Sequence, residues 1–168
     1  MPAPTTCALL LALFAAVTDL RSRRIPNWLT LPGLALAIAW HVTHGTWRTA
    51  ALGFLLATLI YLPLWLAGGR GAGDLKLMAA MGAWLGPTSW IQLFVLTALV
   101  GGLWALGLII AKRRVWVTLR NVFGILRSLL TGRPPGHRLT SKDSLAIPHA
   151  PIVALGMLLW LLAIRPLR

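Results

Sequence analysis

The chain has 168 residues, of which 58% are hydrophobic and 11% charged, and its 16 Lys and Arg outweigh three acidic residues to give a formal net charge of +13. Such an apolar composition excludes a soluble globular domain and indicates an all-helical integral membrane protein. The basic residues lie between apolar runs, so we expect them to contact the anionic cytoplasmic leaflet and not nucleic acid. The single cysteine, Cys7, excludes an internal disulfide framework.

Six apolar runs are candidates for transmembrane helices. They lie at about residues 7–17, 28–44, 50–67, 74–85, 89–111 and 148–164. Two of them, at residues 7–17 and 74–85, are too short to cross a bilayer core on their own, because about 20 residues are normally needed. The first run is nevertheless expected to be a membrane helix, because no Lys or Arg precedes it as in a cleavable signal peptide. Turn residues such as Gly86-Pro87 separate the runs.

The distribution of Lys and Arg over alternate loops predicts the orientation of the chain. The first, third and fifth loops hold 13 basic residues, and the rest of the chain holds three. By the positive-inside rule, the odd loops are cytoplasmic and both termini face outward. Residues 113–131 place basic and apolar side chains on opposite stripes, which predicts a basic interfacial helix between the fifth and sixth spans. We therefore expect one membrane domain over residues 1–168, with residues 113–147 as its cytoplasmic amphipathic helix and loop.

Two of the three carboxylates lie at or inside apolar runs, where ionisation is costly and where an acidic residue by default indicates a functional site. Asp19 lies 15 residues beyond Pro4, and Asp74 lies 12 residues before Gly86. At 1.5 Å per residue, two straight helices would bring both acids to a similar depth near the cytoplasmic face. The third acid, Asp143, lies in a polar loop and is expected to be solvated or to cap a helix.

Two facing carboxyls in a low-dielectric site provide an acid and a base together, because one holds a proton while the other stays charged. The charged carboxylate can take a proton from water while the neutral one donates to a scissile carbonyl, which hydrolyses a peptide bond without a metal. Acidic residues inside membranes also serve proton or ion relays. A third interpretation makes both residues structural, as helix caps or as partners of Arg21 and Lys76. The residues alone leave all three open.

A glycine-rich motif precedes the second acid. Gly71 and Gly73 allow the backbone before Asp74 to turn tightly and let an extended peptide approach the carboxylate. Lys76 follows two residues later, about 200° around a helix, and should face another side. We expect Lys76 to extend to the lipid headgroups, with support of the loop or substrate as the alternative.

A second motif follows the first acid. Pro26 favours an extended conformation at Ile25, and Asn27 can cap the next helix. The four histidines, His41, His44, His137 and His149, lack ligand spacing, so we expect structural or solvated roles for them and no metal site.

Together the two motifs resemble those of the type IV prepilin peptidases, membrane aspartic leader peptidases that join an Asp before an Ile-Pro-Asn turn to a later Gly-x-Gly-Asp-x-Lys. The matching residues here are Asp19, Ile25, Pro26, Asn27, Gly71, Gly73, Asp74 and Lys76. Residues 147–151 and the last apolar run also look like the closing segment of that family. The resemblance implies that Asp19 and Asp74 are the catalytic pair, with the other motif residues supporting them, and it favours a peptidase over a relay.

The resemblance further implies the reaction: removal of the short basic leader of prepilins or pseudopilins at the cytoplasmic face of a bacterial inner membrane, with no cofactor for the peptidase. Long members carry paired cysteines in an insertion near the N-terminus and also methylate the new amino terminus. The first loop of this chain is short and has no cysteine. The chain is therefore similar to the short forms that serve Flp-type (tight adherence) pili, and S-adenosylmethionine is expected only if methyl transfer is retained.

Overall fold

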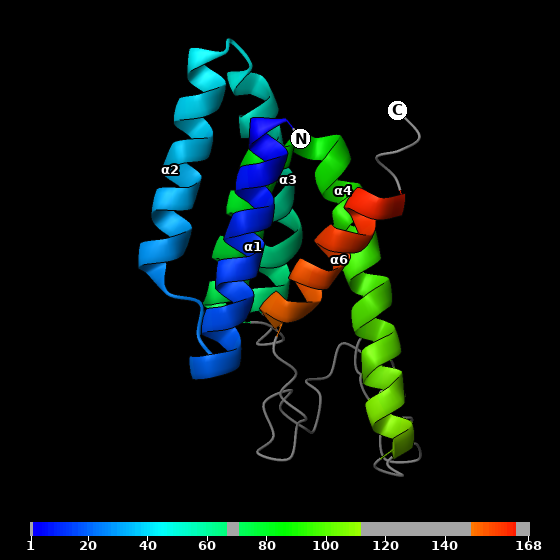
Figure 1. Ribbon diagram of the computed structural model, residues 1–168. Coiled ribbons are helices and arrows are strands. Elements are labelled where there is room, and N and C mark those ends of the chain that lie inside the picture. The colour runs from blue at the N-terminus through cyan, green and yellow to red at the C-terminus, as the bar shows by residue number, and fades with distance from the viewer. Residues whose placement is uncertain (1, 67–70, 112–148, 164–168) are drawn as a thin grey trace, which may run out of the picture. The chain divides into compact units, whose positions relative to one another are not determined.

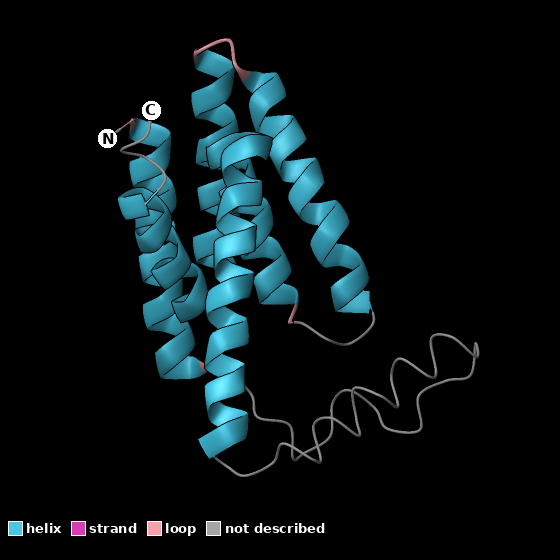
Figure 2. Cartoon of the chain, turned by 90° about the vertical axis from the view of Figure 1, so that its right-hand side faces the viewer, coloured by secondary structure: helices cyan, strands magenta, loops and turns pink. Residues whose placement is uncertain are grey.

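The computed structural model describes residues 2–66, 71–111 and 149–163. Within these ranges all regular structure is helical (Figure 2), as the composition predicted. The helices are α1 (Ala3–Ser22), α2 (Asn27–Thr43), α3 (Trp47–Leu66), α4 (Ala72–Ala111) and α6 (His149–Ala163), as Figure 1 shows. Of the described residues, those up to Val100 form one compact unit with α6, and residues 101–111 belong to a second unit.

Three of the described helices, α1, α3 and α4, are long and apolar enough to cross a membrane. The apolar helix α6 is shorter, with 15 residues. Large apolar side chains point away from the neighbouring helices, including Leu36 at 62% and Leu59 at 72% exposed. Exposure on this scale is expected where lipid surrounds the helices. The described helices therefore support an integral membrane protein, and the expected basic helix at 113–131 lies outside the described residues.

The turn after α1 follows local stereochemistry. The helix ends at Ser22, and Arg23 adopts a left-handed conformation with φ 52° while its N–H bonds the Asp19 carbonyl at 2.8 Å. Such a residue closes many helices, because its N–H satisfies a carbonyl of the last turn. Pro26 is extended and occupies the position before α2. The Arg23 N–H thus closes the last turn of α1 at Asp19.

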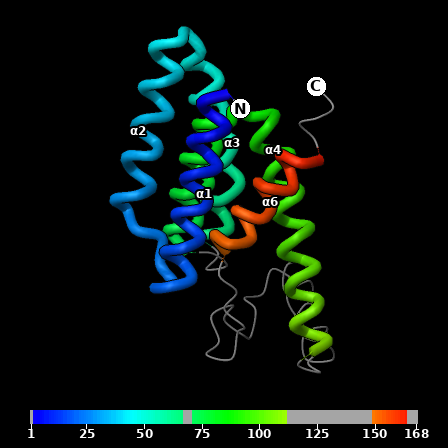
Figure 3. The backbone as a smooth tube through the Cα atoms, viewed as in Figure 1, coloured from blue at the N-terminus to red at the C-terminus, as the bar shows by residue number. Residues whose placement is uncertain are grey.

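Helix α4 consists of two segments that meet at Gly86, where φ is 72° and ψ is 173°. The Trp90 indole N–H donates to the Met78 carbonyl at 3.0 Å, across 12 positions of sequence. In a straight helix these positions would be about 18 Å apart along the axis. The chain must therefore fold back at Gly86, and Figure 3 shows this bend in the green part of the tube. The break predicted at Gly86-Pro87 is confirmed, and Pro87 opens the second segment, where proline is tolerated.

Small residues let the helices of the first unit approach closely. A Cβ built on Gly53 of α3 would collide with the Gly82 carbonyl of α4, and one built on Gly156 of α6 would lie 2.6 Å from Thr97 Oγ1.

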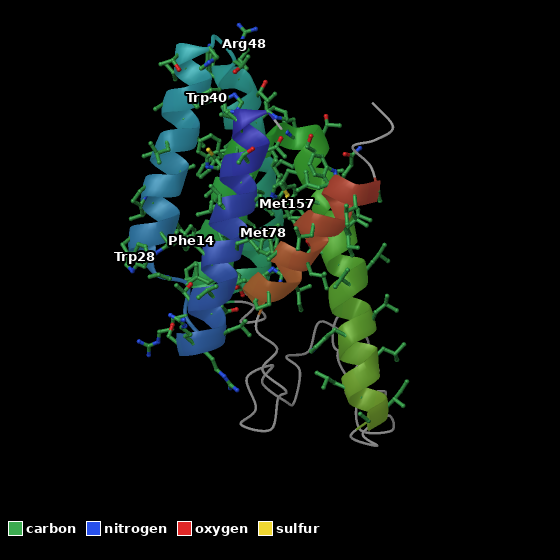
Figure 4. All side chains as sticks on the ribbon, viewed as in Figure 1. Phe14, Trp28, Trp40, Arg48, Met78 and Met157 are labelled. Carbon is green, nitrogen blue, oxygen red and sulfur yellow. The ribbon has the colours of Figure 1, made fainter. Side chains whose placement is uncertain are left out.

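Helix α1 packs against α2 and α6. Met78 and Met157 are fully buried in this core, and Figure 4 places them behind and beside α1. In Figure 3, α1 ends at the same side of the unit where α2, α4 and α6 begin.

Candidate active site

Asp19 is one of the few buried polar groups of the described core. It is 7% exposed, and its Oδ2 accepts a hydrogen bond from the backbone N–H of Ala150 at 3.1 Å. Ala150 is the second residue of α6, so its N–H is among those that have no acceptor within the helix. The amino end of a helix also carries partial positive charge. The start of α6 thus offers the buried Asp19 carboxylate a favourable donor.

Asp74 occupies the first turn of α4 and is half-buried. Its Oδ2 accepts the Gly71 N–H at 3.3 Å, and its own N–H donates to the Gly71 carbonyl at 3.1 Å. A carboxylate in the first turn of a helix is stabilised by the exposed N–H groups and the helix dipole. Both candidate catalytic carboxylates therefore accept a backbone N–H at the beginning of a helix.

Two contacts join the loop after α1 to the start of α4. A Cβ built on Gly73 would lie 3.1 Å from Ile25 Cβ and 3.4 Å from the Ile25 carbonyl oxygen, so the absence of a side chain permits this packing. The Lys76 ammonium donates to Asn27 Oδ1 at 2.9 Å. Four residues of the two sequence motifs thus lie in contact, although the motifs are far apart along the chain.

The structure bears on the expectations for Asn27 and Lys76. The cap expected from Asn27 is wrong, because Pro26 occupies the cap position and no side chain caps α2. Asn27 lies one residue too late to cap, and its amide oxygen instead accepts from Lys76. The extension of Lys76 to the lipid headgroups stays a prediction. Its ammonium bonds the loop after α1, which is the alternative that the sequence left open.

His149 is a residue of this site that sequence reasoning assigned only a structural or solvated role. It is the first residue of α6, is 7% exposed, and shares a hydrogen bond of 3.2 Å between its Nε2 and the Tyr61 hydroxyl. Tyr61 is 1% exposed and lies edge-on to Trp90 and Phe94. The only sequence signal was the resemblance of residues 147–151 to a family segment, because Tyr61 lies 88 positions away.

The other described histidines have the structural or solvated roles that we expected. His41 is buried and hydrogen-bonds Thr46 Oγ1 at 2.8 Å and the Trp84 carbonyl at 3.4 Å. His44 is exposed and hydrogen-bonds the Trp40 carbonyl. His137 and Asp143 lie outside the described residues. Within residues 2–66, 71–111 and 149–163, no group of three His, Cys, Asp or Glu side chains could hold a metal ion.

Comparison with known proteins identifies relatives that share this region. The chain is 37% identical over 116 residues to the prepilin leader peptidase/N-methyltransferase of Burkholderia pseudomallei (strain 1026b), which covers 64% of this chain and 36% of that protein. The protein of the same name from Aeromonas salmonicida (strain A449) is 34% identical over 120 residues, covering 64% and 41%. That of Escherichia coli (strain K12) is 33% identical over 97 residues, covering 52% and 43%. The matched stretch is thus less than half the length of each relative.

No solved structure matches the chain. The sequence profile of the type IV leader peptidase family, however, matches residues 6–106. This range is more than half of the chain, and it contains both acids and both motifs that meet at the start of α4. The chain therefore belongs to the type IV leader peptidase family.

Proposed function

We propose that this protein is an aspartic endopeptidase that removes the short basic leader of prepilins or prepilin-like proteins, with Asp19 and Asp74 as its acid–base pair. The observation that carries the proposal is the meeting of the two family motifs, through the Lys76–Asn27 hydrogen bond and the Gly73–Ile25 contact. These two contacts support a close approach of the segment that follows Asp19 to the turn that contains Asp74. Family membership favours the peptidase over a proton or ion relay.

The proposed reaction uses only the two carboxyls and water. The charged carboxylate takes a proton from water as the oxygen attacks the scissile carbonyl, and the neutral carboxyl donates a hydrogen bond to that carbonyl. The tetrahedral intermediate then collapses as a carboxyl gives a proton to the departing amine. Asp19 and Asp74 share these roles as a coupled pair. The Ala150 and Gly71 N–H groups hold one carboxylate oxygen of each.

We further propose the membrane arrangement that this reaction needs. The two segments of α4, together with α1, α2, α3 and α6, correspond to the six apolar runs of the sequence. With the basic loops on the cytoplasmic side, the ends of α1 and the starts of α2, α4 and α6 face the cytoplasm, where prepilin leaders are synthesised. Both termini then lie outside a bacterial inner membrane, residues 113–131 form an interfacial helix on anionic lipid, and residues 1–168 form one domain.

Methyl transfer is a separate question for this chain. The relatives described above are named as both leader peptidases and N-methyltransferases. The matched stretch covers only 36% to 43% of the relatives described above, and the first loop here has no cysteine. We propose peptidase activity without a cofactor, and S-adenosylmethionine as a ligand only if methyl transfer is retained.

The test of the proposed function is co-expression of the chain with a panel of prepilins, followed by mass measurement of each pilin. The wild-type protein should remove the leader of at least one prepilin. Asp19→Asn and Asp74→Asn should each abolish cleavage while remaining in the membrane, and Asp143→Asn, the matched acid outside both motifs, should retain it. Wild-type protein that leaves every prepilin intact, or cleavage by either dyad variant, would overturn the proposal.

Purified protein provides a second test of the chemistry. Cleavage should continue in the presence of strong chelators, because an aspartic pair activates water with its own shared proton. Loss of cleavage under chelation that added zinc restores would show a metal-dependent mechanism instead.

A further inference from the structure

We propose that the first turn of α6 is a positioning element for Asp19, with the Ala150 N–H holding the carboxylate and a Tyr61–His149 pair fixing the place of that N–H. This inference rests on the proposed function, because it assigns residues to the same reaction. It adds α3 and α6 to a site that the two sequence motifs locate on α1, on α4 and at the start of α2.

A buried hydrogen bond joins Asp19 to the first turn of α6. Asp19 and Ala150 are 131 positions apart, and the 3.1 Å bond between them is buried. Asp19 has little contact with solvent at 7% exposed, so water does not set the orientation of its carboxylate. A donor at the amino end of a helix is already oriented before the reaction, which is how fixed dipoles assist catalysis. The Ala150 N–H therefore defines where Asp19 Oδ2 lies.

Neighbouring side chains anchor the Ala150 N–H. His149 immediately precedes Ala150, and its ring hydrogen-bonds the Tyr61 hydroxyl at 3.2 Å. The Tyr61 ring makes edge-on contacts with two other rings. Its centroid lies 6.3 Å from that of Trp90 and 6.0 Å from that of Phe94. These rings lie on the second segment of α4, which is itself fixed by the Trp90 bond to Met78. The start of α6 is thus anchored to α3 and α4 as well as bonded to Asp19.

The positioning role of the first turn of α6 is separable from a role in general stability. Helix α6 has other attachments farther along, namely the close approach of Gly156 to Thr97 and the bond from Trp160 Nε1 to Gln92 Oε1 at 3.0 Å. These attachments keep α6 in the unit without contacting Asp19. Loss of the first-turn contacts should therefore disturb the carboxylate more than the fold. That difference makes the proposal measurable.

Ala150→Pro is the direct test, because proline lacks the N–H that Asp19 accepts. Proline is tolerated in the first turn of a helix, and residue 151 is already a proline here. A hydrogen bond to a charged group contributes about 1.5–3 kcal/mol, so kcat for prepilin cleavage should fall about 10- to 100-fold. KM should stay unchanged, because the substrate is not bound by this N–H. Ala150→Gly, which keeps the N–H, should retain most of kcat.

Matched controls distinguish positioning from destabilisation. Arg48→Pro puts a proline at the same second position of α3 and should leave kcat unchanged. Figure 4 labels Arg48 at the end of the unit opposite the one where α1 ends. Tyr61→Phe removes only the hydroxyl and should lower kcat at unchanged KM. Trp160→Phe removes a different hydrogen bond of α6 and should lower thermal stability in detergent without lowering kcat.

The outcomes are separable from those of the proposed function. Suppose that the wild-type protein cleaves and that Ala150→Pro or Tyr61→Phe has an unchanged kcat. This result would overturn the positioning role and leave the proposed peptidase activity standing. If Ala150→Pro does not fold, the kcat of the milder Tyr61→Phe variant decides. A loss in Tyr61→Phe that appears in KM alone would also overturn the inference. Failure of the wild-type protein to cleave any prepilin would overturn both proposals together.

Discussion

The Lys76 ammonium lies 2.9 Å from Asn27 Oδ1 and donates a hydrogen bond to it across 49 positions of sequence. Asn27 opens α2, and Lys76 lies in the first turns of α4. The bond therefore links the loop that follows one proposed catalytic acid to the helix that carries the other. It gives both residues a shared role in holding the two motifs together.

We expect the Lys76–Asn27 bond to act as a unit in catalysis. Lys76→Met and Asn27→Leu should each lower the rate of prepilin cleavage about 2- to 10-fold, because a single hydrogen bond of this exposed kind contributes about 0.5–1.5 kcal/mol. The double variant should be no slower than the slower single variant, since partners in one interaction are not additive. Initial cleavage rates of the four proteins measure this coupling. Arg48→Met is the control for loss of an exposed charge, and additive losses in the double variant would show that the two side chains act independently.

The two motif glycines should respond differently to an added methyl group. In Gly73→Ala the new Cβ would lie 3.1 Å from Ile25 Cβ, closer than an ordinary contact, whereas in Gly71→Ala its nearest neighbour is Asp74 Oδ2 at 3.7 Å. Gly73→Ala should push the loop away from α4 and lower the cleavage rate about tenfold, as overpacking costs about 1–3 kcal/mol. Gly71→Ala should cost less. Cleavage assays on membranes with equal amounts of each variant test this order, and the reverse order would contradict the contact.

The bend in α4 should depend on Gly86 far more than the α2–α3 turn depends on Gly45. Both glycines have positive φ, 72° and 68°, which costs a residue with a side chain about 1–2 kcal/mol. A Cβ on Gly86 would in addition lie 2.5 Å from Thr49 Cγ2, while nothing lies within 4 Å of one on Gly45. Thermal unfolding in detergent should therefore show a larger loss of stability for Gly86→Ala than for Gly45→Ala. Equal losses would mean that only backbone strain, and not packing, operates at Gly86.

The proposed orientation predicts which ends of the helices are accessible from each side. In a Cys7→Ser background, Ser22→Cys and Ser141→Cys should react with an impermeant thiol reagent only from the cytoplasm, and Thr46→Cys only from outside. Ser22 and Thr46 lie at opposite ends of the described helices, just where α1 ends and just before α3 begins. Labelling of intact cells against inverted vesicles makes the measurement. Outside labelling of Ser22→Cys would place the proposed active site on the wrong face for leader removal.

Much of this protein could be predicted from local sequence. Helical apolar runs follow from hydrophobicity because lipid leaves the backbone no hydrogen-bond partners except its own. The break at Gly86-Pro87 and the turn before Pro26 follow from the dihedral preferences of glycine and proline, which act within a few residues. The candidate acids stood out because ionisable groups are costly in apolar runs. All of these properties depend on neighbours along the chain.

Only the tertiary structure decided which groups meet. Asn27 was expected to cap its own helix, but Pro26 occupies the cap position, and the Asn27 amide oxygen accepts from Lys76, which α4 brings to it. Nothing near His149 in the sequence indicated that Tyr61 would bond it or that the next N–H would reach Asp19. Those contacts span 88 and 131 positions and exist only because glycine-mediated packing and the reversal at Gly86 bring α3, α4 and α6 together. Periodicity and local propensity contain no information about such distances, so the surroundings of Asp19 had to come from the fold.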